Sequence, residues 1–203
     1  IPVLTEVLAR AGDDKLLPHI VWQNLHPLLE TDALDYLTGL EKHGDTPNLN
    51  KLLPRVVDRI LGSRKPQPAA LAQLQALVGD GKRVPVGVAR QILEMLANKI
   101  HSGELAGESL TKIREKMLPR LAEQRKGAHP LRMEADLLAA AMKDTTALAS
   151  VRTILAGPGN PAELRIRALE SLITAEDDQL LDRLPSLLAD RKTLSSQARG
   201  QML

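Results

Sequence analysis

Helical periodicity continues along the whole sequence. From about residue 3 to the end, short apolar stretches of helical period follow one another, and Gly, Pro, Asp or Asn closes each of them within a few residues. No strand-like pattern competes with this periodicity. Because Phe and Cys are absent and Trp22 and Tyr36 are the only aromatic residues, the apolar side chains are mainly aliphatic and suit closely packed helices. The sequence therefore predicts an all-α fold in which helices pack on helices.

The stretch 47–62 has the clearest helix signals. Thr46 can cap its start, Pro47 takes the tolerated first position, and Gly62 can end it. Apolar residues at helical spacing lie between them and form one stripe, which is typical of an amphipathic helix. By the same signals we predict further helices at 3–11, 15–29, 32–42, 69–78, 85–101, 109–124, 131–143, 146–156, 161–174, 178–189 and from 194 onward.

Polar residues stand at several of the expected helix starts. Asn160 is placed to cap the helix at 161–174, with Pro161 at its first position and Glu163 placed to bond back. Paired carboxylates could also do acid–base chemistry, but capping free amides and complementing the helix dipole explains both residue type and position. The acidic residues assigned to this role are Asp13, Asp14, Asp32, Asp35, Asp144, Glu176, Asp177 and Asp178.

Two segments match each other at an offset of 33 residues. Laying 132–157 over 165–190 places Ala135 on Ala168 and Asp144 on Asp177. A helix, a tight Asp-containing turn and a second helix recurring in this way are typical of α-solenoids. Since the ankyrin and tetratricopeptide signatures are absent, we interpret residues 1–203 as one segment of an α-α superhelix, a HEAT/armadillo-like solenoid of antiparallel helix pairs. An irregular helical bundle stays open as the alternative.

Prolines are expected to shape this array. The segment 63–68 contains two prolines two residues apart, Pro66 and Pro68, and is interpreted as an inter-helix linker. Pro119 and Pro185 fall inside helical patterns. There they would kink a helix or break it, and a kink would help to set the curvature of a solenoid.

Charge and motifs exclude several kinds of site. The net charge is +2 and the isoelectric point about 9.0, so no global field demands nucleic acid or an anionic membrane as partner. No apolar run approaches the roughly 20 residues that span a bilayer, so we expect no membrane insertion. The sequence lacks cysteine, GxGxxG, a P-loop, GxSxG and HExxH. We therefore predict a chain that is not an enzyme, with no catalytic residue, cofactor or metal.

One aromatic residue lies between two histidines. His19, Trp22 and His26 share a helical face, so a ligand pocket with a stacking ring is one reading. The two imidazoles are two turns apart, about 10 Å, which is too far for one zinc ion. Trp22 also has Leu, Ile and Val neighbours on both sides. We favour Trp22 as a packing anchor of the first helix pairs and keep it as a candidate interaction residue.

A basic ridge is predicted at 112–126. Lys112, Lys116 and Arg120 recur every four residues, and three more cations, Arg114, Arg125 and Lys126, accompany them. Such a ridge could contact phosphates or simply be a solvated face. Two glutamates interrupt it and no aromatic residue is interleaved for base stacking. Nucleic-acid binding through this ridge is therefore the alternative function, and the three lysine and arginine residues at four-residue spacing are its candidate site.

The stretch 13–30 resembles part of a known family. It contains an acidic turn, then Leu-Pro-x-x-x-Trp ending at Trp22, then a Pro-bounded acidic end at Glu30. This pattern is similar to one in large proteins of planctomycetes and related bacteria. Those proteins resemble membrane-bound dehydrogenases and combine a sugar-dehydrogenase-like β-propeller, a HEAT-repeat region and a C-terminal cytochrome c domain.

The resemblance implies a non-catalytic scaffold inside a larger, extracytoplasmic redox protein. Catalytic and haem residues would then lie outside this chain, which has no Cys-x-x-Cys-His. The sequence starts without Met and stops within a helical pattern, so we expect a piece of a longer chain. Its expected partners are proteins, either neighbouring domains of the same parent chain or another protein.

Overall fold

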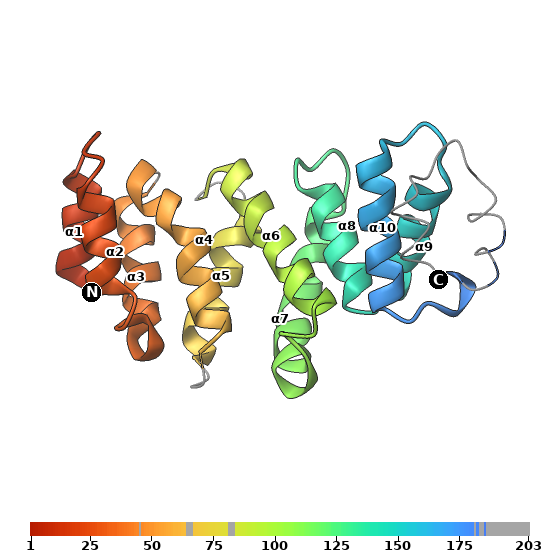
Figure 1. Ribbon diagram of the computed structural model, residues 1–203, viewed down its shortest axis with the longest axis horizontal. Coiled ribbons are helices and arrows are strands. Elements are labelled where there is room, and N and C mark those ends of the chain that lie inside the picture. Colours follow the sequence, from red (N-terminus) through yellow and green to blue (C-terminus); the bar gives the residue numbers. More distant parts are fainter. Residues whose placement is uncertain (45, 64–66, 81–83, 181, 183–184, 186–203) are drawn as a thin grey trace. The chain divides into compact units, whose positions relative to one another are not determined.

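The computed structural model describes residues 1–44, 46–63, 67–80, 84–180, 182 and 185. The part of the chain so described contains α-helices and no β-strand, which confirms the all-α prediction (Figure 1). Residues 178–180 are also helical, but most of the helix predicted at 178–189 and all of that from 194 onward lie outside the described residues. The helices are α1 (Pro2–Arg10), α2 (Leu17–Leu25), α3 (Leu29–His43), α4 (Pro47–Leu61), α5 (Pro68–Asp80), α6 (Val86–His101), α7 (Gly107–Gln124), α8 (Arg132–Ala141), α9 (Thr145–Ala156) and α10 (Ala162–Thr174).

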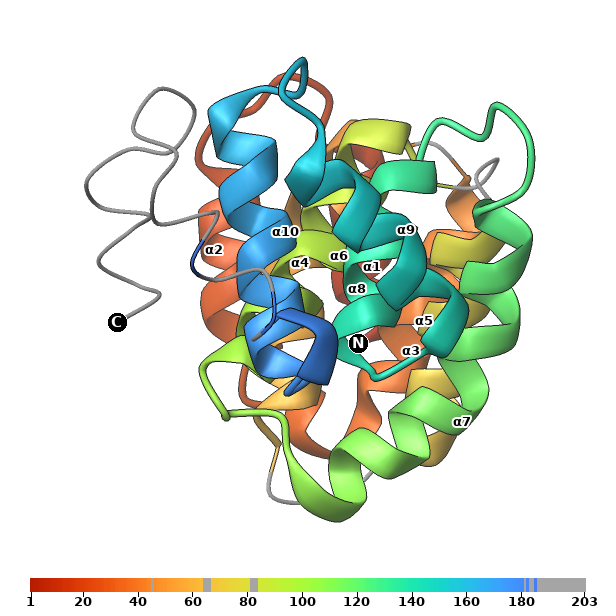
Figure 2. The ribbon, with the colours of Figure 1, turned by 90° about the vertical axis from the view of Figure 1, so that its right-hand side faces the viewer.

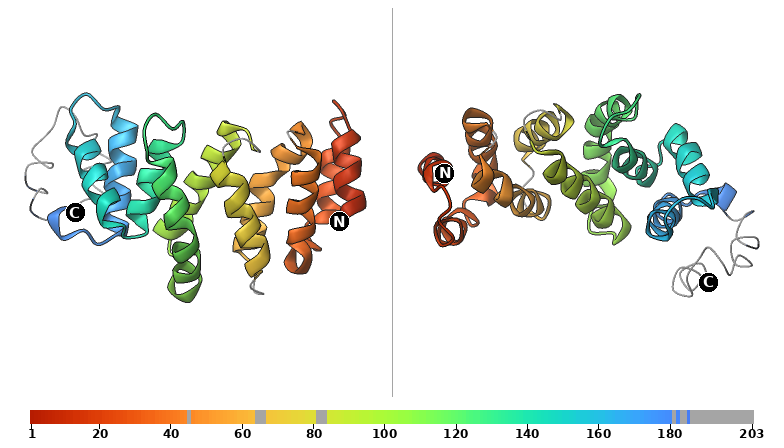
Figure 3. Two further views of the ribbon diagram at one scale, coloured as in Figure 1. Left: turned by 180° about the vertical axis from the view of Figure 1, so that it is seen from behind. Right: turned by 90° about the horizontal axis from the view of Figure 1, so that it is seen from above.

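The chain forms two compact units. Unit 1 comprises Ile1–Met95 with Glu115–Arg120, and unit 2 comprises Leu96–Arg114 with Leu121–Leu203. In unit 1, α1 contacts α2, α3 and α4, while α3 also packs on α4 and α5. Figure 3 shows α1 and α2, in red and red-orange, side by side with α3 next to them. Unit 1 is therefore held together by helices that pack on one another.

Tyr36 is the aromatic residue of the unit 1 core. Its side chain is fully buried, and its hydroxyl donates a hydrogen bond of 2.6 Å to the carbonyl of Leu49. Burial raises the pKa of Tyr36 well above its usual range, so the hydroxyl stays a donor. This bond ties α3 to α4 through the core. The other large buried side chains of unit 1 are aliphatic and include Leu8, Val21, Leu25, Leu29, Leu37, Leu40, Leu53, Val56 and Val57.

The α4 helix matches its predicted limits but not its predicted cap. Its apolar stripe is buried, and Gly62 ends it with its amide donating to Asp58 at 3.0 Å. Thr46 occupies the cap position, yet its hydroxyl donates to the carbonyl of His43 at 3.0 Å instead of accepting from an α4 amide. The threonine therefore stabilises the end of α3. The stripe consists of Leu49, Leu52, Leu53, Val56, Val57 and Ile60.

A single glutamine fills a kink in α3. Asp32 departs from helical geometry, with φ −124° and ψ 30°, close to the break predicted between 15–29 and 32–42. The Gln67 side-chain amide lies against this kink. Its nitrogen donates to the carbonyls of Leu29 (2.7 Å) and Glu30 (3.0 Å), and its oxygen accepts from the amide of Ala33 (3.0 Å). Gln67 thus ends one helical segment and begins the next.

The predicted linker at 63–68 also contacts α3 through its described residues. Ser63 donates to the carbonyl of Glu30 at 3.4 Å, and Pro68 is already the first residue of α5. Residues 64–66 lie outside those described. Ser63 and Gln67, the loop residues of the predicted linker that the structure describes, therefore both bind α3.

The buried side chains of unit 2 include several alanines. Helices α8, α9 and α10 contact one another and lie side by side (Figure 2). Alanines are buried in these helices together with leucines, and a small side chain lets helix backbones approach closely. Trp22 and Tyr36, the two aromatic residues of the chain, both belong to unit 1. The fully buried alanines are Ala135, Ala139, Ala140, Ala147 and Ala168.

The 33-residue offset reappears in the backbone of unit 2. Lys143 and Glu176 both have left-handed geometry, with φ 62° and 54°, and each lies two residues after the last residue of α8 or α10. At the first turn, Asp144 N donates to Ala139 O (3.0 Å) and Lys143 N to Ala140 O (2.8 Å). The second turn repeats these bonds with Asp177 to Leu172 (3.1 Å) and Glu176 to Ile173 (2.9 Å). Both are Schellman endings followed, two residues later, by a new helical segment.

The start of α10 differs from its prediction. Asn160 does not cap this helix, because its side-chain nitrogen donates to the carbonyl of Ile154 at 2.7 Å and so closes the end of α9. Pro161 is the residue before the first helical turn, where no side-chain cap bond forms. The first residue of this helix was therefore predicted one position too early, and the prediction that Asn160 caps α10 was wrong.

Candidate functional site

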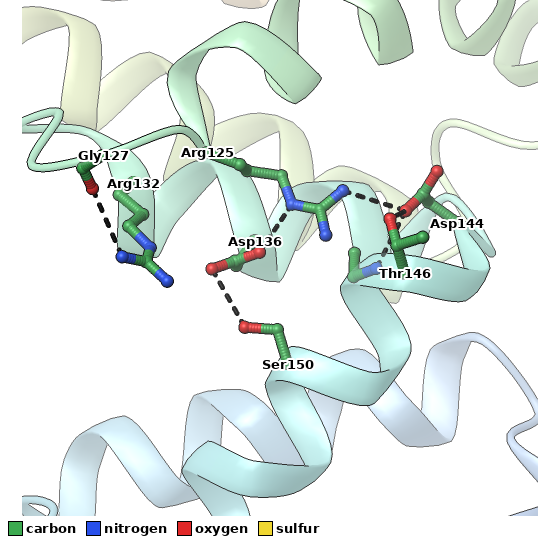
Figure 4. Close-up of polar contacts among 8 residues, drawn as sticks. Arg125, Gly127, Arg132, Asp136, Asp144, Thr146 and Ser150 are labelled. Atoms are coloured by element: carbon green, nitrogen blue, oxygen red, sulfur yellow. Dashed lines mark hydrogen bonds and ion pairs between the residues drawn. The ribbon is translucent and has the colours of Figure 1, made fainter.

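Arg125 bridges two aspartates of unit 2 (Figure 4). Its Nε donates to Asp136 at 2.6 Å and a terminal nitrogen donates to Asp144 at 2.9 Å. The other oxygen of Asp136 accepts from the hydroxyl of Ser150 at 3.1 Å. The side chains of Arg125 and Asp136 are only 15% and 6% exposed. Arg125 was predicted to extend the basic ridge, but its charge is already used inside the unit.

Asp144 joins this network to the start of α9. Its carboxylate accepts from the backbone amide of Ala147 at 2.8 Å, which confirms the predicted cap, and from Thr146 at 2.7 Å. Burial would raise the pKa of Asp144, but the hydrogen bonds from Thr146, Ala147 and Arg125 and the charge of Arg125 outweigh it. The pKa of Asp144 is therefore lowered, and the carboxylate is held in its charged form.

The equivalent turn of α10 is also held by an arginine. Arg152 of α9 donates from Nε to Asp177 at 2.9 Å and makes a second bond to the other oxygen. Hydrogen bonding to Asp177 raises the pKa of Arg152. Glu176 pairs with Lys143 at 2.8 Å, and this bond lowers the pKa of the Glu176 carboxyl. Glu176 and Asp177 were predicted to cap a helix. Instead, Glu176 forms an ion pair with Lys143 in the turn after α8, and Asp177 forms one with Arg152 of α9.

The basic residues of α7 are exposed, as predicted, but unequal. Lys112 lies 3.4 Å from Glu108, and Lys126 lies 2.8 Å from Glu123. Lys116 and Arg120 have no ion-pair partner among the residues described, and both side chains are exposed. Pro119 lies within α7 without ending it. Two of the three candidate cations are thus exposed and form no ion pair with the described residues.

Trp22 was predicted to anchor the packing of the first helix pairs because its neighbours in sequence are apolar. Its side chain is half-buried, while Leu16 and Ile20 beside it are 71% and 51% exposed. Only Val21 and Leu25 of the flanking apolar residues point into the core. The apolar neighbours of Trp22 in sequence are therefore divided between the core and the surface.

A cation and an imidazole border the indole instead. The guanidinium carbon of Arg55, on α4, lies 5.8 Å from the centroid of the Trp22 ring. The His26 ring lies 5.9 Å away, tilted by 34°. Gln23 holds both histidines, with its carbonyl accepting from His26 Nδ1 (3.3 Å) and its amide 3.1 Å from His19 Nε2. Among the described residues, no group of His, Cys, Asp or Glu is arranged to hold a metal ion.

Sequence reasoning missed Arg55 because α4 was treated as a packing helix. Lys51 and Arg55 are exposed on the side of α4 away from its buried stripe, one turn apart. Their spacing is a signal of a basic helix face, but only the contact between α2 and α4 brings one of them to Trp22. Over the described residues, the helices are too short or too polar for any of them to cross a bilayer.

No protein-family model, curated protein or solved structure matches this chain. The resemblance of the stretch 13–30 to planctomycete redox proteins therefore stays a prediction.

Proposed function

We propose that this chain is a non-catalytic helical-repeat scaffold that binds proteins. The observation that carries the proposal is the recurrence of one turn in unit 2. Lys143 and Glu176 have the same backbone geometry 33 residues apart, each directly after a helix. Asp144 and Asp177 follow them, and each is bound by an arginine from the chain segment before it. A helix pair recurring at this interval is the building unit of repeat proteins.

Such a unit suits a scaffold for a physical reason. A single helix pair cannot bury both faces, so pairs stack, and their edges form long surfaces that neighbouring proteins can contact. The Arg152–Asp177 and Lys143–Glu176 pairs each join consecutive helix pairs. They would hold the angle between those pairs and thus the shape of the surface. We extend this to a HEAT/armadillo-like solenoid of antiparallel pairs as part of the proposal.

The resemblance supplies a context for the scaffold. We propose that it links or supports domains of a larger, extracytoplasmic redox-type protein, whose chemistry takes place in other domains. Its partners would then be neighbouring domains of the same parent chain or another protein.

Nucleic-acid binding is the second candidate, and one observation favours it. Lys116 and Arg120 are exposed on α7 and lack an ion-pair partner among the described residues. Three other observations weaken it, since Lys112 and Lys126 have glutamate partners and Arg125 is enclosed by aspartates. A cationic surface reduced in this way offers few phosphate contacts.

Site-specific cross-linking tests the two functions together. A photo-reactive amino acid is placed separately at Ile20, Lys116 and Thr153, all exposed, and the protein is irradiated in an extract of its native cells. We expect protein adducts at one or more positions that survive nuclease treatment. Adducts made only of nucleic acid, or no adduct at any position, would contradict the scaffold.

A binding assay isolates the alternative. We expect no retention of polynucleotide at about 0.15 M salt, the physiological ionic strength. Binding that falls steeply with salt and disappears in the triple variant Lys112→Glu/Lys116→Glu/Arg120→Glu would instead establish the basic ridge as a nucleic-acid surface. The variant Lys51→Glu/Arg55→Glu serves as its control for loss of positive charge elsewhere.

A further inference from the structure

We propose that the Trp22–Arg55 surface, formed by Trp22 of α2, His26 directly after that helix, and Lys51 and Arg55 of α4, binds an acidic peptide segment of a protein partner. The proposal rests on the proposed function of the chain as a protein-binding scaffold. It adds where in unit 1 a partner binds and which chemistry the partner must present.

The guanidinium of Arg55 is held against an aromatic ring. It lies over the indole of Trp22, 5.8 Å from the ring centroid. Stacking on an aromatic ring orients the planar guanidinium while its N–H groups remain available at the edge. No carboxylate of the described residues lies within ion-pair distance of it. Arg55 is thus a positioned donor fork, and a carboxylate is the acceptor that matches such a fork in geometry and charge.

A second cation, Lys51, lies on the same side of α4 as Arg55. Lys51 is one turn before Arg55, and both are exposed because the buried stripe occupies the opposite side of α4. Lys51 also has no ion-pair partner in the described part of the chain. Two neighbouring cations without an ion-pair partner among the described residues favour a ligand with at least two carboxylates, spaced about one helical turn or two extended residues apart.

The aromatic part of the surface distinguishes a peptide ligand from a nucleic acid. The indole is half-buried and His26 lies at 5.9 Å from it, so the surface has an apolar, aromatic part beside its cations. Single-stranded nucleic acid would use an open aromatic face for base stacking, but Arg55 already occupies a face of Trp22. Tryptophan and arginine are the residues that most often dominate protein–protein contacts. The arrangement therefore favours a peptide with acidic residues next to an apolar one.

Trp22 provides the assay, because it is the single tryptophan of the chain. The probe is a twelve-residue peptide that alternates Glu with Leu and Ser, compared with matched peptides in which Gln or Lys replaces Glu. We expect the Glu peptide to change tryptophan emission saturably and in a salt-sensitive way. The Gln and Lys peptides should bind at least about tenfold more weakly, as expected for loss of a charge-assisted contact.

Variants assign the effect to this surface. Arg55→Gln should weaken binding of the Glu peptide about tenfold or more, and Lys51→Gln should weaken it less. Arg120→Gln removes another exposed cation, on α7, and should leave the affinity unchanged. Arg55→Glu should lose the Glu peptide and gain affinity for the Lys peptide, a reversal that a misfolded variant would not give.

Three results would overturn the proposal. They are equal binding of the Glu and Gln peptides, unchanged affinity in Arg55→Gln, and tighter binding of a single-stranded oligonucleotide than of the Glu peptide. Failure of the scaffold itself is distinguishable. Protein adducts at Lys116 or Thr153 without peptide binding would leave the scaffold standing and remove this surface, whereas no adduct at any position would remove both.

Discussion

Lys143 and Glu176 form an ion pair of 2.8 Å between two residues that lie 33 positions apart and share a left-handed backbone. Each residue ends a helix, and a new helical segment begins two residues later. The pair therefore connects two copies of the same turn. A side chain other than glycine in this conformation is strained, by about 1–2 kcal/mol per residue. Both turns thus keep a charged side chain where the backbone alone would favour glycine.

Substitutions at Lys143 should reverse the usual order of alanine and glycine. We expect Lys143→Gly to be more stable than Lys143→Ala by about 1 kcal/mol, because only glycine adopts a φ of 62° without strain. In the middle of α9, at exposed Ala149, a change to glycine should cost about 0.5–1 kcal/mol instead. Urea unfolding followed by far-ultraviolet circular dichroism measures all three. Equal stability of the two Lys143 variants would contradict the left-handed turn.

Gln67 should tolerate neither alanine nor glutamate. Gln67→Ala leaves three backbone groups at the α3 kink without their partner, so we expect a loss of about 1–3 kcal/mol. Gln67→Glu at neutral pH keeps an acceptor for Ala33 but places a carboxylate against the carbonyls of Leu29 and Glu30. It should be less stable than the alanine variant.

Acid should rescue the glutamate variant. The carbonyls would raise the pKa of the new carboxyl in the folded state above its unfolded value of about 4.3. Stability from the protonated form is then present below that value and is lost as pH rises through the folded pKa. Hydrogen exchange in the peptide 29–33 should slow on acidification in this variant beyond the intrinsic pH effect seen in Gln67→Ala. Parallel behaviour of the two variants would remove the proposed bridging role of Gln67.

Arg125 should matter for folding more than for any surface. Arg125→Met leaves the buried carboxylate of Asp136 without its cation, and we expect a cost of about 3 kcal/mol or more. The double variant Arg125→Met/Asp136→Leu should recover part of this loss. Lys126→Met, which removes the adjacent cation of an exposed pair, should leave the unfolding midpoint almost unchanged. If Arg125→Met unfolds at nearly the same urea concentration as the wild type, the buried contact between Arg125 and Asp136 is contradicted.

Asp144 should make unit 2 sensitive to acid. Its pKa in the folded protein is lowered from 3.8, so its contribution to stability is present above that value and is lost as pH falls through the folded pKa. Asp144→Asn keeps an acceptor for Ala147 but loses the charge that attracts Arg125. The difference in free energy of unfolding between wild type and variant should therefore shrink as the pH falls below about 3.8. Asp13→Asn, which removes an exposed carboxylate in the loop before α2, is the matched control for the loss of one negative charge.

Features that depend on neighbouring residues could be predicted from the sequence. The stripe of α4 follows from helical spacing alone, and all of its members are buried. The cap by Asp144 needs only an amide three residues later, and it forms as predicted. Gly62 ends α4 for the same local reason.

Features that depend on distant contacts could not be predicted. Asp177 occupies the position of Asp144 one offset later, but Arg152 from another helix binds it. Gln67 acts on residues 34–38 positions away. Arg55 reaches Trp22 only because α2 packs on α4. In each case the side chain has several potential partners, and only the packing of helices selects one.

The position of the two aromatic residues gives the units different optical properties. Trp22 and Tyr36 lie in unit 1, and unit 2 has no Phe, Trp or Tyr. Near-ultraviolet absorption and dichroism of the whole chain therefore originate in unit 1, while the peptide bonds of both units contribute below 250 nm. If unit 2 opens by itself, it will lose its helices without any near-ultraviolet change, and the two spectral regions will follow different unfolding curves.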